Sequence, residues 1–212
     1  MNIGMVCYAS VGGSGVVATE LAYALAIRGH RIHVISTEPP FRLREGVPGL
    51  FFHEVEVPPY PLFREPQYLL ALTNTLSHVA ESERLDIIHA HYAVPHATAA
   101  YLARLMLDAS PGRTPKTVTT LHGTDITLIG SDPSYRRVVA FSIERSDAVT
   151  AVSRSLRDTP SSRSACAARS RSFPTSSTAR SSAVCRIASS APSCVRPTAT
   201  TRWSCTCRTS AR

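Results

Sequence analysis

The last quarter of the sequence lacks most of the residue types from which folded domains are built. From Thr159 to Arg212 there is no Leu, Gly, Lys, Asp, Glu, Asn, Gln, His, Tyr or Met. Nine arginines lie in this stretch, whereas all 15 acidic residues of the chain precede it. The formal net charge of +8 therefore resides in the C-terminal stretch. The residues before it are close to neutral, so their composition does not predict a nucleic-acid partner.

The C-terminal stretch also lacks a helical or strand period and has few large apolar side chains. Because it cannot offset the entropy cost of its own ordering, we expect residues 159–212 to be disordered. One interpretation is an Arg/Ser-rich tail that binds RNA. We favour another, a GC-rich gene read out of frame. A shift of one nucleotide can turn residues 174–178 into Pro-Asn-Phe-Val-Asp, and residues 203–211 into a strand-like string that ends in a polar turn.

Two further absences concern the compartment. No apolar run approaches the roughly 20 residues that a membrane-spanning helix needs, and no basic segment precedes the first apolar run as in a secretory signal. Cys7 is the only cysteine before the tail, which suggests a reducing compartment and an ordinary core residue. We therefore expect a cytoplasmic protein without a membrane partner.

The part before the tail has the pattern of an α/β domain. Runs that are apolar at nearly every position suit strands buried on both faces, as in a parallel sheet. Alternation of such strands with helices predicts a doubly wound, Rossmann-like parallel sheet. The expected strands cover residues 3–8, 31–36, 51–57, 85–91, 116–122 and 146–152, and the expected helices cover 16–29, 68–83 and 96–110.

Polar residues close several of these strands, where sheets of this kind bind ligands. The first strand leads into a glycine turn, and the later strand ends carry imidazoles, hydroxyls and one guanidinium. We expect these groups to converge on one edge of the sheet. They are Gly12, Gly13, Ser14 and Gly15; His89, His91, Tyr92 and His96; His122, Thr124 and Asp125; and Ser153 and Arg154.

The glycine turn allows a close approach of backbone to a ligand, and the following helix favours an anion. It lacks the Gly-Lys-Ser/Thr ending of a P-loop. Gly13-x-Gly15-x-x-Ala18 after a strand, with Glu38 past the second strand, also fits a loose dinucleotide pattern. An NAD-dependent oxidoreductase is therefore an alternative.

A metal site is the other alternative for the histidines. His89 and His91 share one face of a strand, and His96 and His122 could join them. No Asp, Glu or Cys lies beside them at ligand spacing, and histidines inside apolar strands are usually hydrogen-bonded core groups. We therefore expect no metal.

With these motifs assembled, residues 2 to about 157 resemble the N-terminal half of the N-acetyl-α-D-glucosaminyl L-malate synthases. These are retaining, family 4 glycosyltransferases of the GT-B fold that catalyse the first step of bacillithiol biosynthesis. HYAVPHA and TTLHGTDIT are the specific motifs, whereas GGSG alone is not. The out-of-frame strings also look like this family's linker and the opening of its second domain. The resemblance makes residues 1–158 a GT-B N-terminal, acceptor-binding domain.

The resemblance implies transfer of N-acetylglucosamine from UDP-GlcNAc to the hydroxyl of L-malate, without a metal ion. It places an anion, either a malate carboxylate or the donor diphosphate, on Gly12 to Gly15 and the Ser14 hydroxyl. Tyr92 and Thr120 would contact the acceptor, with Thr124 in the same substrate site. His122 would face the sugar or the forming charge, and Asp125 would orient His122 or cap the next helix. Arg154 is a candidate cation for a carboxylate, with a surface role as the alternative.

The chain departs from the family where the donor-binding domain should follow. As written it is expected to lack donor binding and turnover. The sequence does not determine which acceptor is used, because related enzymes use inositol phosphate, lipids or other sugars. Intact relatives are expected to form dimers or higher oligomers.

Overall fold

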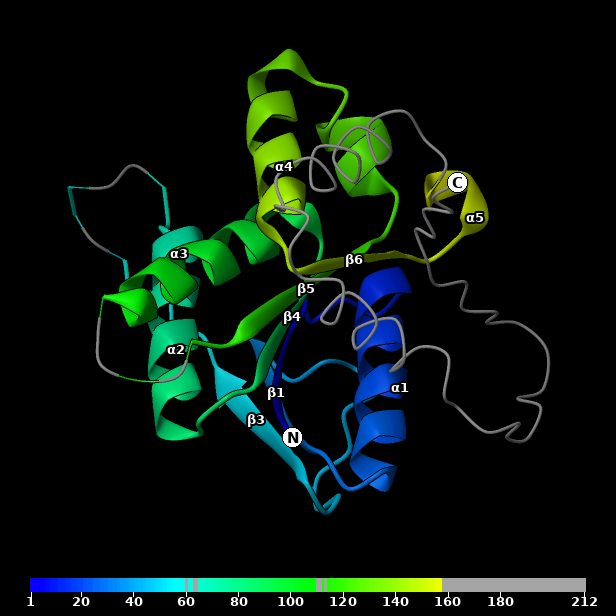
Figure 1. The fold of residues 1–212 in the computed structure, drawn as a ribbon, viewed down its shortest axis with the longest axis vertical. Helices are drawn as coiled ribbons and strands as arrows, with labels where there is room; N and C mark the ends of the chain where they lie inside the picture. The colour runs from blue at the N-terminus through cyan, green and yellow to red at the C-terminus, as the bar shows by residue number, and fades with distance from the viewer. Residues whose placement is uncertain (60, 63–64, 110–111, 113, 158–212) are drawn as a thin grey trace, which may run out of the picture.

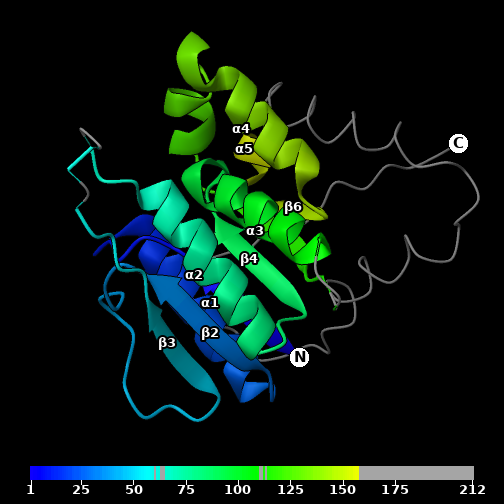
Figure 2. The same cartoon turned by 90° about the vertical axis from the view of Figure 1, so that its left-hand side faces the viewer.

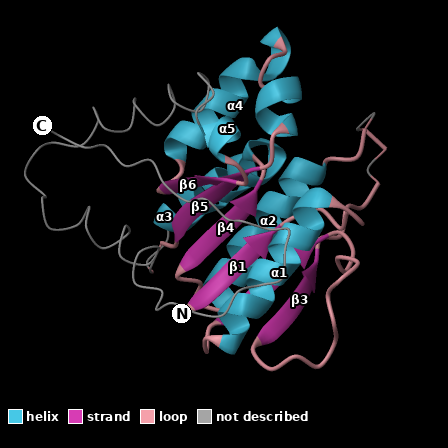
Figure 3. Ribbon diagram, turned by 90° about the vertical axis from the view of Figure 1, so that its right-hand side faces the viewer, coloured by secondary structure: helices cyan, strands magenta, loops and turns pink. Residues whose placement is uncertain are grey.

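The computed structural model describes residues 1–59, 61–62, 65–109, 112 and 114–157. The expected tail, 159–212, lies outside the described residues, and so does the domain boundary drawn at residue 158. Within the described part, six parallel strands form one sheet in the order β3-β2-β1-β4-β5-β6. Its strands run in the same direction in Figure 3. The prediction of a doubly wound parallel sheet is confirmed.

The strands lie close to their predicted positions. They are β1 (Asn2–Val6), β2 (Arg31–Ser36), β3 (Leu50–Glu54), β4 (Ile87–His91), β5 (Lys116–Leu121) and β6 (Ala148–Ala151). The helices are α1 (Gly13–Ile27), α2 (Tyr68–Ser82), α3 (Thr98–Asp108), α4 (Pro133–Arg145) and α5 (Arg154–Arg157), with two wide turns η1 (Ala93–Ala97) and η2 (Asp125–Ile129).

The sheet is covered unequally on its two faces. Figure 1 shows α1 on one side of the sheet and α2 and α3 on the other, and Figure 2 shows α2, α3 and α4 next to one another. Alternate residues of β1 separate the two cores: Met5 packs with the α1 side, and Val6 packs against α2 and α3. A third cluster joins α4 to the ends of β5 and β6.

A glycine turn ends α1. Gly29 has φ +82°, and its N–H donates to the Ala26 carbonyl at 2.9 Å. The N–H of His30 donates to the Leu25 carbonyl at 3.2 Å. This pair of bonds is a Schellman motif, which needs a residue at positive φ, and glycine adopts that conformation without strain.

Cys7, just beyond β1, is fully buried in the core on the α1 side. Burial raises the pKa of its thiol to about 12, so the thiol stays protonated at neutral pH. The expectation of an ordinary core cysteine agrees with this position.

Candidate functional site at the carboxyl edge of the sheet

The strand order reverses between β1 and β4. From β1 the chain moves outward through β2 and β3, then returns to β4 on the other side of β1. Parallel sheets of this order bind ligands beyond the carboxyl ends of the strands at this reversal. The glycine turn follows β1, the HYAVPHA motif follows β4, and HGTD follows β5. Three of the predicted motifs are therefore neighbours at one edge.

The glycine turn brings the chain against the start of α1. A Cβ on Gly15 would lie 2.4 Å from the Ser10 carbonyl oxygen, so no side chain fits there. Gly12 and Gly13 are exposed, and a Cβ on either would meet nothing within 4 Å. No side chain caps the helix at Gly12. The turn therefore has one face closed by the protein and one face open to a ligand.

Ser14 lies between Gly13 and Gly15 at the start of α1. Its side chain is buried, and its Oγ lies 3.4 Å from Oγ of Ser10, which also donates to the Gly12 carbonyl at 3.0 Å. The Ser14 hydroxyl thus takes part in shaping the turn.

Beside the turn, six rings from four segments pack into one group, which we call the aromatic cluster. Tyr8 lies 4.4 Å from the ring centre of His96 and 5.6 Å from that of Tyr92. Tyr92 lies 4.9 Å from the ring of His122. The members are Tyr8, Tyr68, His91, Tyr92, His96 and His122. This cluster joins β1, β4 and β5 at their carboxyl ends to the start of α2.

His96 is fully buried, and its tautomer follows from its partners. Its Nδ1 bonds the backbone carbonyl of His91, which can only accept, so Nδ1 carries the proton. Its Nε2 lies 3.2 Å from the Tyr68 hydroxyl and accepts from it. His96 therefore fixes the loop after β4 to α2, and it is not free to bind a ligand.

Thr120 lies in the sheet and not at the surface of the edge. It is 2% exposed, and its Oγ1 lies 2.7 Å from both His89 Nε2 and Thr150 Oγ1. Its hydroxyl is therefore engaged within the protein. Tyr92, which the sequence analysis paired with Thr120 as an acceptor contact, is only partly buried and lies among the clustered rings.

Asp125 is fully buried and accepts backbone hydrogen bonds from two loops. Its Oδ1 accepts from the N–H groups of His122 and Gly123 at 3.2 and 2.9 Å, and its Oδ2 accepts from Ala93 at 3.3 Å. Burial raises the pKa of this carboxyl, against the lowering effect of these hydrogen bonds. Asp125 thus holds the loop after β5 against the loop after β4, and places His122 through the backbone.

Tyr92 adopts a strained backbone conformation. Its φ is +95° and its ψ is 143°, a region that is nearly exclusive to glycine. The turn that follows is wide, since the N–H of Ala97 donates to the Tyr92 carbonyl five residues back at 3.2 Å. Strain of this kind costs on the order of 1–3 kcal/mol and persists where the surrounding structure imposes it, commonly at functional sites.

Two predicted site residues stand apart from the cluster. Thr124 is exposed at the start of η2, and Arg154 is exposed at the start of α5. Among the described residues, neither has a ring contact or an ion pair with the aromatic cluster. Glu38, invoked for the dinucleotide alternative, is exposed in the loop after β2.

Burial keeps the histidines of this edge uncharged. Desolvation lowers the pKa of His89, His96 and His122 to about 4. It lowers the pKa of His91 well below the usual range. At neutral pH these rings act as neutral hydrogen-bonding groups.

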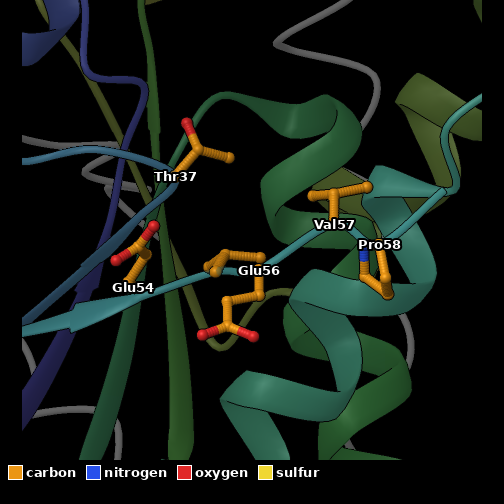
Figure 4. A pocket seen from close by; sticks show the side chains of 6 residues that line it. Thr37, Glu54, Glu56, Val57 and Pro58 are labelled. Carbon is orange, nitrogen blue, oxygen red and sulfur yellow. The ribbon is translucent and has the colours of Figure 1, made fainter.

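A separate shallow hollow of about 380 Å³ lies at the carboxyl ends of β2 and β3, lined by residues 54–58 and Thr37. Figure 4 shows that the carboxylates of Glu54 and Glu56 point in different directions. The hollow therefore offers no converging set of polar groups.

Within the described ranges, no three His, Cys, Asp or Glu side chains are grouped as metal ligands. None of the described helices is both long and apolar enough to span a membrane.

The parallel sheet and its flanking helices form a Rossmann-like domain. The residues beyond the carboxyl ends of β1, β4 and β5 form its candidate ligand site. Comparison with known proteins gives the family. Residues 11–164 match the sequence model of Glycosyltransferase Family 4, and the chain belongs to that family. This assignment does not favour the NAD-dependent alternative.

A curated relative, N-acetyl-alpha-D-glucosaminyl L-malate synthase of Bacillus anthracis, is 56% identical over 156 residues. The match covers 74% of this chain and 40% of the relative, so the chain spans less than half of that protein's length.

Two solved structures share the fold. One is a glycosyltransferase of Rickettsia africae, with a TM-score of 0.51 and 22% identity over 72% of this chain and 36% of that one. The other, from Listeria monocytogenes, is described as a UDP-N-acetylglucosamine 2-epimerase, with a TM-score of 0.50 and 10% identity over 80% of this chain and 42% of that one.

Three members of the aromatic cluster have roles that the sequence did not reveal. Tyr8 and Tyr68 carried no motif, although Tyr8 directly follows the first apolar run. His91 was predicted to lie at this edge and was weighed as a metal ligand, but its hydrogen bond to His122 was not predicted. Sequence spacing signals none of these contacts, because each joins segments far apart in the chain.

Proposed function

We propose that this chain is the acceptor-binding part of a retaining glycosyltransferase that moves N-acetylglucosamine from UDP-GlcNAc to the hydroxyl of L-malate. The observation that carries the proposal is the 56% identity over 156 residues to a relative with that name. The lone cysteine before the tail favours the cytoplasm as the compartment. The proposed reaction uses no metal ion.

The edge of the sheet supplies groups suited to malate. Gly12 and Gly13 leave backbone open at the start of α1, where an anion is favoured by the helix dipole. Tyr92 offers a hydroxyl, and His122 offers a neutral ring beside it. In this proposal the turn and Tyr92 bind malate, and His122 faces the sugar or its leaving phosphate. Catalysis then rests on positioning and on fixed dipoles.

In this proposal Thr120 and Asp125 hold the site together and do not contact the substrate. Thr120 is bonded to His89 and Thr150 behind the edge, and Asp125 holds the two loops together. Thr124 and Arg154 are proposed as substrate contacts only with the second half of the enzyme in place, since both are exposed.

The test is malate-dependent UDP release. We propose that residues 159–212 are out of frame, so two proteins are compared: the chain as written, and one with its reading frame restored after Arg157. Release of UDP from UDP-GlcNAc is expected from the restored protein with malate, giving an α-glycoside by NMR, and not from the chain as written. Release that is unchanged without malate, or equal with inositol phosphate, would reject malate as the acceptor.

Sequencing the coding DNA across residues 157–160 tests the frame independently. A displaced frame relative to close relatives is expected there. An undisturbed frame would contradict the frameshift while leaving the assignment to the family intact.

A further inference from the structure

His91 and His122 form a direct imidazole–imidazole hydrogen bond. Nδ1 of His91 lies 3.0 Å from Nε2 of His122, with ring centres 5.1 Å apart. His91 comes from the last position of β4, and His122 directly follows β5. Both rings are neutral at pH 7, so one of the two bonded nitrogens carries the shared proton and the other accepts it.

The two possible directions of this bond differ at the far side of His91. His91 is fully buried, and its Nε2 is buried without a hydrogen-bond partner. If His122 donated, Nε2 of His91 would have to carry a proton, leaving a buried N–H without an acceptor. If His91 donates from Nδ1, its Nε2 is a bare lone pair. Orphaned buried N–H groups are the rarer case in folded proteins, and acceptors without partners are better tolerated.

The direction of this hydrogen bond also determines whether Nδ1, the other ring nitrogen of His122, carries a proton. When Nε2 of His122 accepts, its single proton lies on Nδ1. His122 is only partly buried, and within the described residues its Nδ1 makes no hydrogen bond inside the protein. That N–H is therefore available to a ligand at the carboxyl edge, beside Tyr92.

We propose that His91 is a positioning residue that holds His122 in the Nδ1–H tautomer, so that His122 presents a neutral hydrogen-bond donor to an oxygen of the bound substrate. The donor would serve a sugar hydroxyl or a phosphate oxygen. The consequence for turnover rests on the proposed function, whereas the tautomer itself does not.

The experiment is a long-range ¹H–¹⁵N correlation spectrum of the chain labelled with ¹⁵N-histidine, at pH 7. His122 is expected to show a protonated Nδ1 and an unprotonated Nε2, and His91 is expected to show the same pattern. A protonated Nε2 on His122 would overturn the proposal. No variant and no catalytic activity are needed for this result.

Variants separate positioning from general damage to the fold. His91→Phe removes the donor, and the His122 signals should move toward the Nε2–H form. His91→Asn keeps an N–H near the position of Nδ1 and should restore the Nδ1–H form. His89→Phe is the control, because the His89 ring is also buried and stacks on His91, with ring centres 4.8 Å apart, but hydrogen-bonds Thr120 and not His122. If it shifts the His122 tautomer as much as His91→Phe does, the positioning role is refuted.

The frame-restored protein supplies the catalytic arm. His91→Phe should lower kcat about tenfold, the loss expected for one neutral hydrogen bond, with little change in the KM for malate, and His91→Asn should recover most of it. An unchanged kcat with the expected tautomer shift would overturn the catalytic consequence. An inactive parent protein would instead reject the proposed function, and the spectrum would still decide the tautomer.

Discussion

Gly12 and Gly15 are three residues apart in the same turn, but a side chain would meet different surroundings at each. At Gly15 a Cβ would lie 2.4 Å from a backbone oxygen, which cannot move aside as a flexible side chain can. We expect Gly15→Ala to lower the free energy of unfolding by about 3 kcal/mol. Gly12 has an ordinary φ of −124°, so Gly12→Ala should cost no more than about 1 kcal/mol, the cost of a poorer N-cap.

Urea denaturation of the two variants measures this difference. Gly12→Ala also tests the open face of the turn, because its Cβ would occupy space that malate needs in the proposed function. It should weaken malate binding, measured by calorimetry, in a protein that remains folded. Equal stability losses for the two variants would show that the loop before Gly12 yields to a side chain at Gly15.

Asp125 is predicted to act as a connector between loops. Asp125→Ala leaves three backbone N–H groups without their carboxylate, and should cost about 3 kcal/mol. In Asp125→Ala, hydrogen exchange at the amides of Ala93 and Gly123 should accelerate more than exchange in the centre of the sheet does. Asp125→Asn keeps one carbonyl oxygen and should lose less stability. If the Ala93 amide exchanges unchanged in Asp125→Ala, the bond between the two loops does not protect it.

Individual contacts of the site were only partly predictable from sequence. The sequence places Gly15 after a strand and before a helix, and that position already implies a close approach of backbone. It does not show that His122 bonds His91, because these residues are 31 positions apart and meet through strand pairing. Thr120 was expected to contact substrate, but whether a hydroxyl in a polar strand faces the edge or a neighbouring strand depends on the register of β4, β5 and β6.

At the scale of elements, α4 depends on a defined cap. Asp132 accepts a hydrogen bond from the N–H of Ser134 at 2.8 Å, and Pro133 occupies the first turn. Asp132→Ala should lower the free energy of unfolding by about 1 kcal/mol, whereas Asp132→Asn should stay within a few tenths because it keeps an accepting oxygen. Denaturation curves of both variants check this. A loss for Asn as large as that for Ala would mean that the negative charge stabilises α4, and not the capping bond.

Helix α4 was not predicted from the sequence, whereas each strand in the described residues was expected. The strands are recognisable because residues buried on both faces form continuous apolar runs. Residues 133–145 contain four charged or hydroxyl positions in their first half, and only Val139, Ser142 and Ile143 are buried. A helix that buries so narrow a stripe gives a weak periodic signal. The wide turns η1 and η2 have no sequence signature, since they arise from contacts such as those of Asp125.

At the scale of the whole molecule, the buried histidines determine how the fold responds to acid. His33, His89 and His96 are buried, and burial lowers the pKa of each to about 4. An unfolded histidine has a pKa near 6.5. Between these values the unfolded chain binds protons that the folded chain does not, so the free energy of unfolding falls as pH decreases from about 6.5 to about 4. Above about pH 7 these groups contribute no pH dependence.

The expected slope is up to about 1.4 kcal/mol per pH unit for each such histidine. Asp125 opposes it in part, because its raised pKa lets the folded state bind a proton at a higher pH than the unfolded state does. Residues 159–212 contain no His, Asp or Glu side chain, so they add no side-chain titration in this range. The measurement is urea denaturation at a series of pH values from 7.5 to about 4.5.

Two variants isolate the cause of that slope. His96→Asn should lower the free energy of unfolding at every pH, because it disturbs the bonds to Tyr68 and to the His91 carbonyl. It should also reduce the slope of that free energy against pH by the contribution of one histidine. His78 is exposed on α2, and His78→Gln is the control because it leaves the three buried histidines in place. The slope rather than the absolute stability carries the test, because a damaged but folded variant still reports how many protons its unfolding takes up. An unaltered slope in His96→Asn would show that His96 is already charged in the folded protein, or that it remains neutral when the chain unfolds.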